Sequence, residues 1–275
     1  MLRLSPSKAN TFIRCRMAYY WNYVENLRLK HEEMAPQIGK VVHSLSHLYQ
    51  TGKIDRTMTI GEVEELAMTL FEGTEAAEPI VKEASRLFIS FLRTCDDGKL
   101  TFVCSELPMT IELDGCDGLV MYGIPDGFVR TEDGRLWRYE TKTAARIDNP
   151  YLNGLKKGLQ GSMYDYMAEQ LMQEKVSGTI HNLIVKTKEP KYYRNFSQRD
   201  QRAIDRMLLT IKGVFEDIKQ CEASGVWYPS CDCYHFNREC EYTLLCNHDS
   251  ERVRCGFYTQ YKNDVVVEPE EGNEE

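Results

Sequence analysis

The chain has 275 residues, 42% of them apolar, and a formal net charge of −8. This length allows one large domain or two small ones with an ordinary hydrophobic core. The net charge argues against a protein that coats DNA without specificity, but six of the acidic residues lie in residues 264–275, so the charge is neutral evidence about DNA binding. No apolar run approaches the length of a membrane span and the first residues lack a signal-peptide core, so we expect a soluble, cytoplasmic protein with no membrane partner.

The predicted elements begin with a helix from Pro6 to about Val24, with Ser5 as its N-cap. Further helices are expected over residues 38–50, as a pair over 60–94, and over 152–176 and 197–222. Between them, residues 100–116 have the apolar runs of strands, a hairpin follows, and 181–188 is a further predicted strand. Helices on both sides of a central block of strands predict an α/β fold with a mixed sheet.

The hairpin carries the most information about function. Glu140 and Lys142 alternate along its second strand and therefore point the same way. A two-residue turn at Asp133-Gly134 would set Asp126 opposite Thr141, with the two acidic groups on opposite faces. A three-residue loop that ends in a left-handed Gly134 would set Asp126 opposite Glu140.

In the second register the carboxylates of Asp126 and Glu140 are near enough to share a hard cation. Lys142, on the same face, can then hold an attacking water or a phosphate. This arrangement predicts phosphodiester hydrolysis. The alternative is a solvated hairpin face with a weak ion pair, because Asp-Gly is a common hairpin turn.

Asp126 with Glu140-Thr141-Lys142 resembles the motif of the PD-(D/E)XK nucleases. Upstream, Gly39 to His43 is similar to the Gly-x-x-x-His element of the RecB-like branch, and downstream Gln160 to Tyr164 is similar to its Gln-x-x-x-Tyr element. The elements follow the family's order between about residues 4 and 246. The resemblance implies an α/β, restriction-endonuclease-like core with a central mixed sheet flanked by helices.

The resemblance also implies roles for these residues. His43, Asp126, Glu140 and the Thr141 carbonyl would hold one or two Mg²⁺ or Mn²⁺ ions, and Lys142 would act in catalysis beside Asp126 and Glu140. Gln160 and Tyr164 would contact the DNA backbone.

Two other residues near these motifs are weaker candidates. Glu106 is a looser match to an upstream metal-site glutamate, or a surface glutamate. His47 gives zinc-type i, i+4 spacing with His43, but the Glu of a His-Glu-x-x-His zinc hydrolase is missing.

A cysteine cluster lies near the C-terminus, where Cys233, Cys240 and Cys246 are separated by six and five residues. This pattern resembles the iron–sulphur end of the same branch, including CRISPR-associated exonucleases and AddB-type nucleases, in which an upstream cysteine completes the set. That cysteine would be Cys15, and four thiolates suit a [4Fe–4S] cluster. Members of the branch often have a two-residue first gap. Cys231 and Cys255 are alternative ligands, and zinc is an alternative metal.

A basic segment follows the predicted strand. Residues 186–206 hold seven basic and three acidic residues, with Tyr192, Tyr193 and Phe196 interleaved. Basic groups bind phosphates and aromatic rings stack on unpaired bases, so the segment is a candidate contact for nucleic acid. The alternative is the solvated start of a helix.

The sequence therefore predicts an N-terminal helical region with the first cluster cysteine (1–99), a nuclease core (100–222), a cysteine-rich segment (223–263) and an acidic disordered tail (264–275). The implied function is a metal-dependent DNA exonuclease that acts on single-stranded DNA or free ends, in recombination, repair, phage replication or CRISPR adaptation, with the proteins of those processes as partners. Two alternatives remain: a non-catalytic DNA-binding or assembly subunit of the same fold, and a zinc-stabilised interaction protein.

Overall fold

The computed structural model describes residues 1–30, 34–70, 77–230, 233–235 and 238–261, so Cys231 and the predicted acidic tail lie outside the described residues. The chain divides into two compact units, one of residues 1–9 and 32–217 and the other of residues 10–31 and 218–275. The division falls within two helices, α1 (Pro6–Arg14) and α8 (Gln201–Ser224). In the described parts of the chain no helix is long and apolar enough to cross a membrane.

The first unit is built on a five-stranded sheet in the order β3-β6-β7-β8-β9. Its strands are β3 (Leu100–Ser105), β6 (Gly127–Thr131), β7 (Leu136–Ala144), β8 (Val176–Val185) and β9 (Lys191–Ser197). Strands β7 and β8 pair in parallel and the other neighbours are antiparallel, so the mixed sheet predicted from the sequence is confirmed.

A smaller sheet of the same unit has the order β1-β5-β4. Its strands are β1 (Leu2–Leu4), β4 (Met109–Glu112) and β5 (Leu119–Gly123). Strand β1 is parallel to β5, and β4 is antiparallel to it. The chain leaves β5 at Gly123 and reaches β6 four residues later, so Asp126 lies in the short connection between the two sheets.

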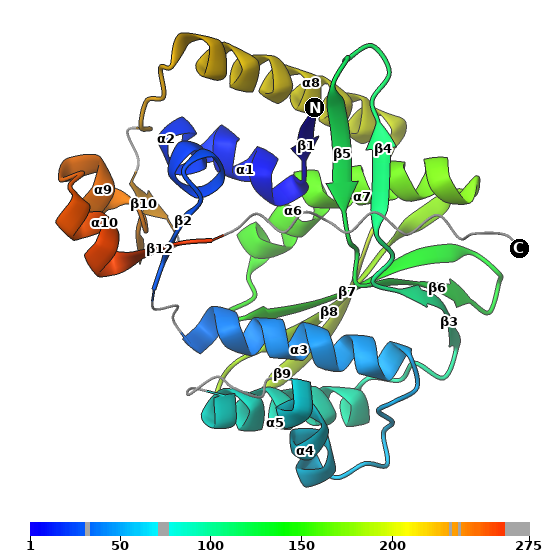
Figure 1. Cartoon of the computed structure of the whole chain (residues 1–275). Coiled ribbons are helices and arrows are strands. Elements are labelled where there is room, and N and C mark those ends of the chain that lie inside the picture. The colour runs from blue at the N-terminus through cyan, green and yellow to red at the C-terminus, as the bar shows by residue number, and fades with distance from the viewer. Residues whose placement is uncertain (31–33, 71–76, 231–232, 236–237, 262–275) are drawn as a thin grey trace, which may run out of the picture. The chain divides into compact units, whose positions relative to one another are not determined.

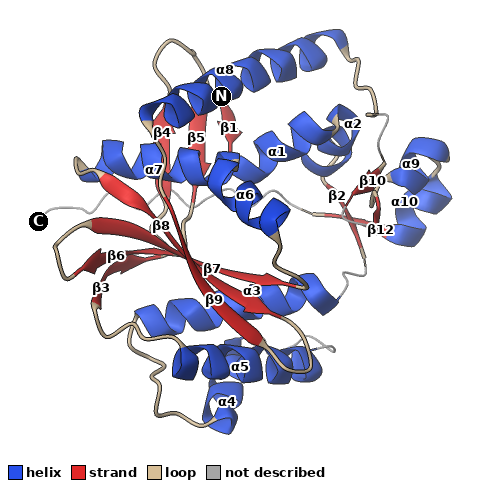
Figure 2. Cartoon of the chain, turned by 180° about the vertical axis from the view of Figure 1, so that it is seen from behind, coloured by secondary structure: helices blue, strands red, loops and turns tan. Residues whose placement is uncertain are grey.

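Helices cover both faces of the five-stranded sheet. Figures 1 and 2 show α3 (Met34–Gln50), α4 (Ile60–Leu70) and α5 (Ala77–Thr94) on one face, and α7 (Leu159–Met172) on the other, after the short α6 (Asn149–Lys157). The apolar sides of α3 and α5 meet in a core whose members include Val42, Leu45, Leu87 and Phe88, each fully buried. Burial of each such side chain contributes about 1.5–3 kcal/mol, so this face anchors α3 firmly on the sheet.

The second unit consists of short elements around an aromatic core. They are α2 (Arg16–Tyr19), a π-helical turn η1 (Tyr20–Val24), β2 (Leu27–Leu29), β10 (Tyr234–His235), β11 (Arg238–Glu239), α9 (Thr243–Asn247), α10 (Glu251–Phe257) and β12 (Tyr258–Gln260). Strand β12 pairs with β2, and the buried Tyr242 donates a hydrogen bond to the Leu27 carbonyl at 2.9 Å. Residues more than 200 positions apart thus share one core.

Three expected elements differ from the structure. The single helix over 6–24 is wrong, because Cys15 is extended and its Sγ accepts the N–H of Ala18 at 3.4 Å, which starts a new helix. The helix over 152–176 is two helices, because Gly158 leaves the helical conformation with ψ of 140°. Strand β9 is not predicted from the sequence, because its aromatic residues alternate with charged and polar ones and resemble the solvated start of a helix.

The hairpin has the second of the two registers considered above. Arg130 pairs with Leu136, and Thr131 donates to the Arg135 carbonyl at 3.1 Å, so the loop has three residues. Gly134, its last residue, has φ of +80°. Continued by one pair, this register sets Asp126 opposite Glu140.

Gly134→Ala is expected to lower the free energy of unfolding by about 1 kcal/mol, because a Cβ disfavours the left-handed conformation. Gly61→Ala is the matched control. Gly61 lies in α4 with open space around it and no positive φ, so alanine should leave stability unchanged or slightly higher. Urea unfolding of both variants measures the difference, and equal losses would contradict the assigned loop.

Candidate active site

Helix α3 lies close against strand β7 because of one glycine. A Cβ on Gly39 would stand 3.3 Å from Thr143 Oγ1 on that strand, tighter than almost all real Cβ contacts. Two turns further along, Ser46 Oγ lies 3.1 Å from Thr141 Oγ1, in a buried hydrogen bond. The close contact brings His43, one turn after Gly39, to the strand that carries Glu140 and Lys142.

Asp126 meets both α3 and β7. Its Oδ2 accepts the backbone N–H of Thr141 at 2.8 Å and lies 3.0 Å from His43 Nδ1. Burial lowers the pKa of His43, but the adjacent Asp126 outweighs it, so the pKa is raised above its usual value. The main chain of Asp126 is held as well, because its carbonyl accepts the N–H of Glu106 and the hydroxyl of Ser105.

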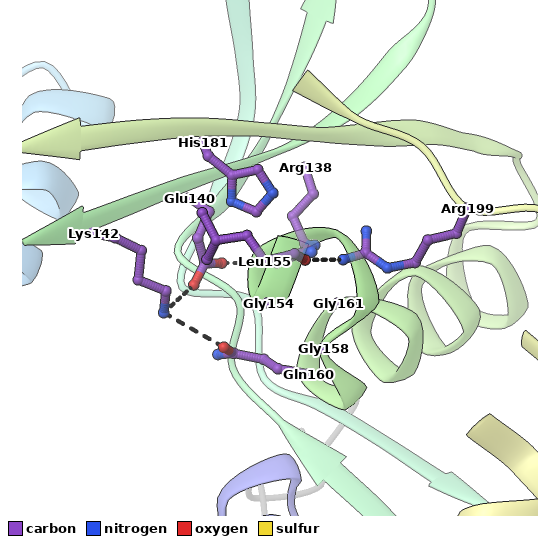
Figure 3. Close-up of a pocket in the computed structure, with 10 residues that line it drawn as sticks. All are labelled: Arg138, Glu140, Lys142, Gly154, Leu155, Gly158, Gln160, Gly161, His181 and Arg199. Atoms are coloured by element: carbon purple, nitrogen blue, oxygen red, sulfur yellow. Dashed lines mark hydrogen bonds and ion pairs between the residues drawn. The ribbon is translucent and has the colours of Figure 1, made fainter. Parts of the chain in front are cut away.

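Glu140 is buried between two cations (Figure 3). Its Oε1 lies 2.6 Å from Lys142 Nζ, and its Oε2 lies 2.8 Å from an Arg138 guanidinium nitrogen. Burial by itself would raise the pKa of Glu140, but Lys142 and Arg138 hold it well below its usual range. Burial likewise lowers the pKa of Lys142, and Glu140 and Asp126 raise it above the ordinary lysine value. Both groups are therefore charged at neutral pH.

Arg138 belongs to a buried network that the sequence analysis missed. Its Nε donates to Asp165 Oδ1 at 3.0 Å and a terminal nitrogen donates to Thr179 Oγ1 at 2.6 Å. Asp165 in turn accepts a bond from Arg199 at 3.0 Å. The available signal was alternation, because Arg138 lies two residues before Glu140 and so shares its face of β7.

The two residues of the Gln-x-x-x-Tyr element differ in exposure. Gln160 Oε1 accepts a bond from Lys142 Nζ at 3.4 Å, which brings this residue to the site. Tyr164 is buried, and its ring fills the space beside Gly123, where a Cβ would be only 2.3 Å from the ring. The Tyr164 ring is therefore part of the packing between α7 and β5.

The weaker candidates lie next to the site. His47 Nδ1 is 2.9 Å from Ser105 Oγ and 3.4 Å from Glu106 Oε2. Glu106 has a φ of +49°, uncommon for a residue with a side chain. The structure thus pairs His43 with Asp126 and His47 with Glu106, and the two histidines lie one turn apart on α3.

The metal-ligand predictions for these residues remain predictions. As the side chains stand, no three His, Cys, Asp or Glu groups within the described residues are close enough together to hold an ion. Glu140 is bound to Lys142 and Arg138, and His43 to Asp126. The carboxylate oxygens among them are nevertheless the kind of donor that Mg²⁺ and Mn²⁺ prefer.

The four predicted cluster cysteines all lie in the second unit. Cys15 Sγ accepts the backbone N–H groups of Ala18 and Ser230, and Ser230 is 215 residues away in the chain. The backbone N–H of Cys240 donates to the Cys233 carbonyl at 2.7 Å. Burial raises the pKa of the Cys246 thiol, and the neighbouring Cys15 and Cys233 raise it further. Residues from both ends of the chain therefore gather around these thiols.

The basic segment is partly used inside the protein. Arg194 donates to Asn182 and to the buried Asp97, and Arg199 is bonded to Asp165. The rings of Tyr193 and Phe196 are about half exposed on the edge strand β9. Two of the seven basic side chains are therefore held internally rather than presented to solvent.

The mixed sheet with Asp126, Glu140 and Lys142 at one edge of α3 defines a restriction-endonuclease-like protein. The chain belongs to the PD-(D/E)XK nuclease superfamily, whose family model matches residues 3–247. The PD-(D/E)XK nucleases generally use Mg²⁺ or Mn²⁺.

Two solved structures are similar to this chain. A Eubacterium rectale protein to which exonuclease activity is ascribed is 15% identical, with a TM-score of 0.57 over 90% of this chain and 88% of that one. The structure of SSO0001 is 16% identical, with a TM-score of only 0.33 over 70% and 78% of the two chains. No curated protein matches. The first likeness supports the fold assignment.

Arg138→Met is expected to lower the free energy of unfolding by about 3–5 kcal/mol, because it leaves Glu140 buried with one cation fewer and removes a partner of Asp165. The control is Arg130→Met, which breaks a solvent-screened pair with Glu174 and should leave the free energy of unfolding almost unchanged. Thermal or urea unfolding measures both. Similar small losses would show that the network does not hold the fold together.

Proposed function

We propose that this protein is a metal-dependent DNA exonuclease. The observation that carries the proposal is that strand β7 brings two pairs together. His43 contacts Asp126, Lys142 contacts Glu140, and Asp126 also accepts the backbone N–H of Thr141, the residue between Glu140 and Lys142. The Eubacterium rectale protein ascribed exonuclease activity supports action at DNA ends. Single-stranded DNA and free ends are the proposed substrates, in recombination, repair, phage replication or CRISPR adaptation.

The proposed metal ligands are His43, Asp126, Glu140 and the Thr141 carbonyl. The oxygen donors of this set fit a hard divalent cation, because two carboxylates and a backbone carbonyl are the ligands that Mg²⁺ and Mn²⁺ prefer. A bound Mg²⁺ or Mn²⁺ would polarise the scissile phosphate and lower the pKa of the attacking water. For Glu140 to serve, its Oε1 must leave Lys142 while Arg138 keeps Oε2.

Lys142 is the proposed catalytic cation. Its ammonium stays protonated beside Glu140 and Asp126, so it can donate hydrogen bonds to a phosphate oxygen as negative charge develops there. Gln160, already bonded to Lys142, is proposed to contact the DNA backbone. Because Tyr164 is buried, we assign its ring to supporting Gln160 and α7, and only its hydroxyl to any contact with DNA.

We also propose that Cys15, Cys233, Cys240 and Cys246 bind a [4Fe–4S] cluster. The test of fit is the indole N–H of the buried Trp21, whose hydrogen bond toward the Cys246 thiol lowers the pKa of that thiol. Together with the two N–H groups on Cys15, it supplies donors of the kind that stabilise thiolate sulphur. Such a cluster would link the two chain segments of the second unit, residues 10–31 and 218–275.

Lys142→Ala and Asp126→Asn should each lower DNA cleavage at least about a hundredfold, measured per folded molecule, because each removes charge stabilisation or metal ligation. The assay uses end-labelled single- and double-stranded DNA with Mn²⁺ or Mg²⁺. Lys99→Ala, which breaks an exposed pair with Glu132, is the control and should cleave normally. Cleavage that survives both site changes would overturn the site; a folded, metal-replete wild type that cleaves nothing would favour a non-catalytic DNA-binding subunit.

Cys240→Ser should cost the protein its brown colour and part of its thermal stability. Iron and sulphide analysis of protein purified without oxygen provides the measurement. Cys116→Ser, a half-buried cysteine of the first unit, is the matched control and should keep both. A colourless, zinc-loaded wild type would refute the iron–sulphur proposal and leave a zinc site on the same thiolates.

A further inference from the structure

A small cavity lies beside the candidate active site, with a volume of about 70 Å³. One wall carries Glu140 and Lys142, and the opposite wall is the turn from α6 into α7 (Figure 3). Arg138, His181 and Arg199 complete it. Pockets for whole small molecules have volumes of about 300 Å³ or more, so this one has room for a single small group.

The charge of the cavity favours an anion. Three cations line it, Arg138, Lys142 and Arg199, against the single carboxylate of Glu140. Asp165 stands behind the two arginines and neutralises a second charge. The three cations and two carboxylates together therefore carry a net charge of +1.

Helix α7 adds donors to the same cavity. It runs for 14 residues from Leu159, and its N-cap is Gly158, which offers no side-chain hydrogen bond. The first N–H groups of such a helix have no partner in the helix and carry a partial positive charge. Gly158 and Gly161 both line the cavity, so this helix end faces it without intervening side chains at those positions.

Two buried nitrogens beside the cavity have no partner. Arg199 Nε and His181 Nδ1 each lack a hydrogen bond within the protein. Both side chains are almost completely buried, with 2% of Arg199 and 3% of His181 exposed. Leaving a buried polar group without a hydrogen bond destabilises the folded state. A group that brings acceptor oxygens into the cavity would remove that destabilisation.

Gly161 shows how closely Arg199 is held against this helix end. A Cβ at position 161 would stand only 1.8 Å from a terminal nitrogen of Arg199, so the guanidinium passes over the first turn of α7 where only glycine leaves room. The same guanidinium donates to the Leu155 carbonyl at 2.9 Å, on α6. The arginine is therefore fixed in place before any ligand arrives.

We propose that this cavity binds the terminal phosphate of a DNA strand. A tetrahedral phosphate supplies acceptor oxygens to the arginine and the helix end. It also supplies one to His181, in the tautomer that carries its proton on Nδ1 and accepts the Ser197 hydroxyl at Nε2. The cavity has room for one phosphate group but not for the two sugars that flank an internal phosphate, whereas a terminal phosphate has a sugar on one side only. The inference rests on the proposed nuclease function, because Lys142 and Glu140 form one wall and the bond to be cut would lie next to the anchored end.

The test compares single-stranded oligonucleotides that carry a phosphate or a hydroxyl at the 5′ end, and a second pair that differs at the 3′ end. All are internally labelled, so that the ends stay unmodified. Binding to the full chain is measured by fluorescence anisotropy in EDTA, and initial cleavage rates are measured with Mn²⁺. Wild type should bind one phosphorylated end at least about tenfold more tightly than its hydroxyl form, since hydrogen bonds to a charged group are stronger than those to a neutral one.

Arg199→Lys should abolish this end preference. Lysine keeps a positive charge next to Asp165 but has no equivalent of the Nε–H group, so the fold should survive better than with a neutral residue. Arg130→Lys, which changes an arginine of a partly exposed pair, is the control and should keep the preference.

Equal affinity of wild type for phosphate and hydroxyl at both ends would overturn the proposal, and this comparison needs no variant to fold. Cleavage without any end preference would refute the terminal-phosphate cavity and leave the nuclease function standing. A clear end preference in binding without any cleavage would support the terminal-phosphate cavity and refute the nuclease function.

Discussion

Glu140 is a carboxylate that the sheet buries almost completely, and the structure around it is arranged to keep it charged. Lys142 binds one of its oxygens and Arg138 the other. A charge at 2% exposure is tolerated only when it is paired, so Arg138 needs Asp165, and Asp165 needs Arg199. The buried Glu140 thereby requires the charged side chains Arg138, Asp165 and Arg199 between β7, β8 and α7.

The opposite face of β7 imposes a second constraint, which is close approach. Gly39 lets α3 lie against Thr143, and the hydrogen bond between Ser46 and Thr141 holds the helix there. The large apolar core of α3, α4 and α5 supplies the energy that presses this helix onto the sheet. His43 therefore reaches Asp126 as a consequence of packing, and the nearby backbone bond from Thr141 sets the direction of the carboxylate.

The two units have different physical characters. The first has a large aliphatic core and an ion network, while the second has a small core of Trp21, Tyr242, Leu245 and Tyr258 among very short helices and strands. A core of that size supports few ordered residues by itself, which is the situation in which proteins use metal links. The proposed cluster on Cys15, Cys233, Cys240 and Cys246 is a link of that kind.

The sequence alone determined the mixed α/β fold, the hairpin with its two possible registers, and the family, because strand alternation and ordered motifs are local patterns. It was wrong where local signals are ambiguous: Cys15 breaks the first helix through its own side-chain bond, Gly158 divides another, and β9 resembles a polar loop. Only the tertiary structure decided that Asp126 faces Glu140, since that depends on the left-handed Gly134 and on pairing across the sheet. It alone joined Arg138, Asp165 and Arg199, because burial makes partners of charges that are far apart in the chain.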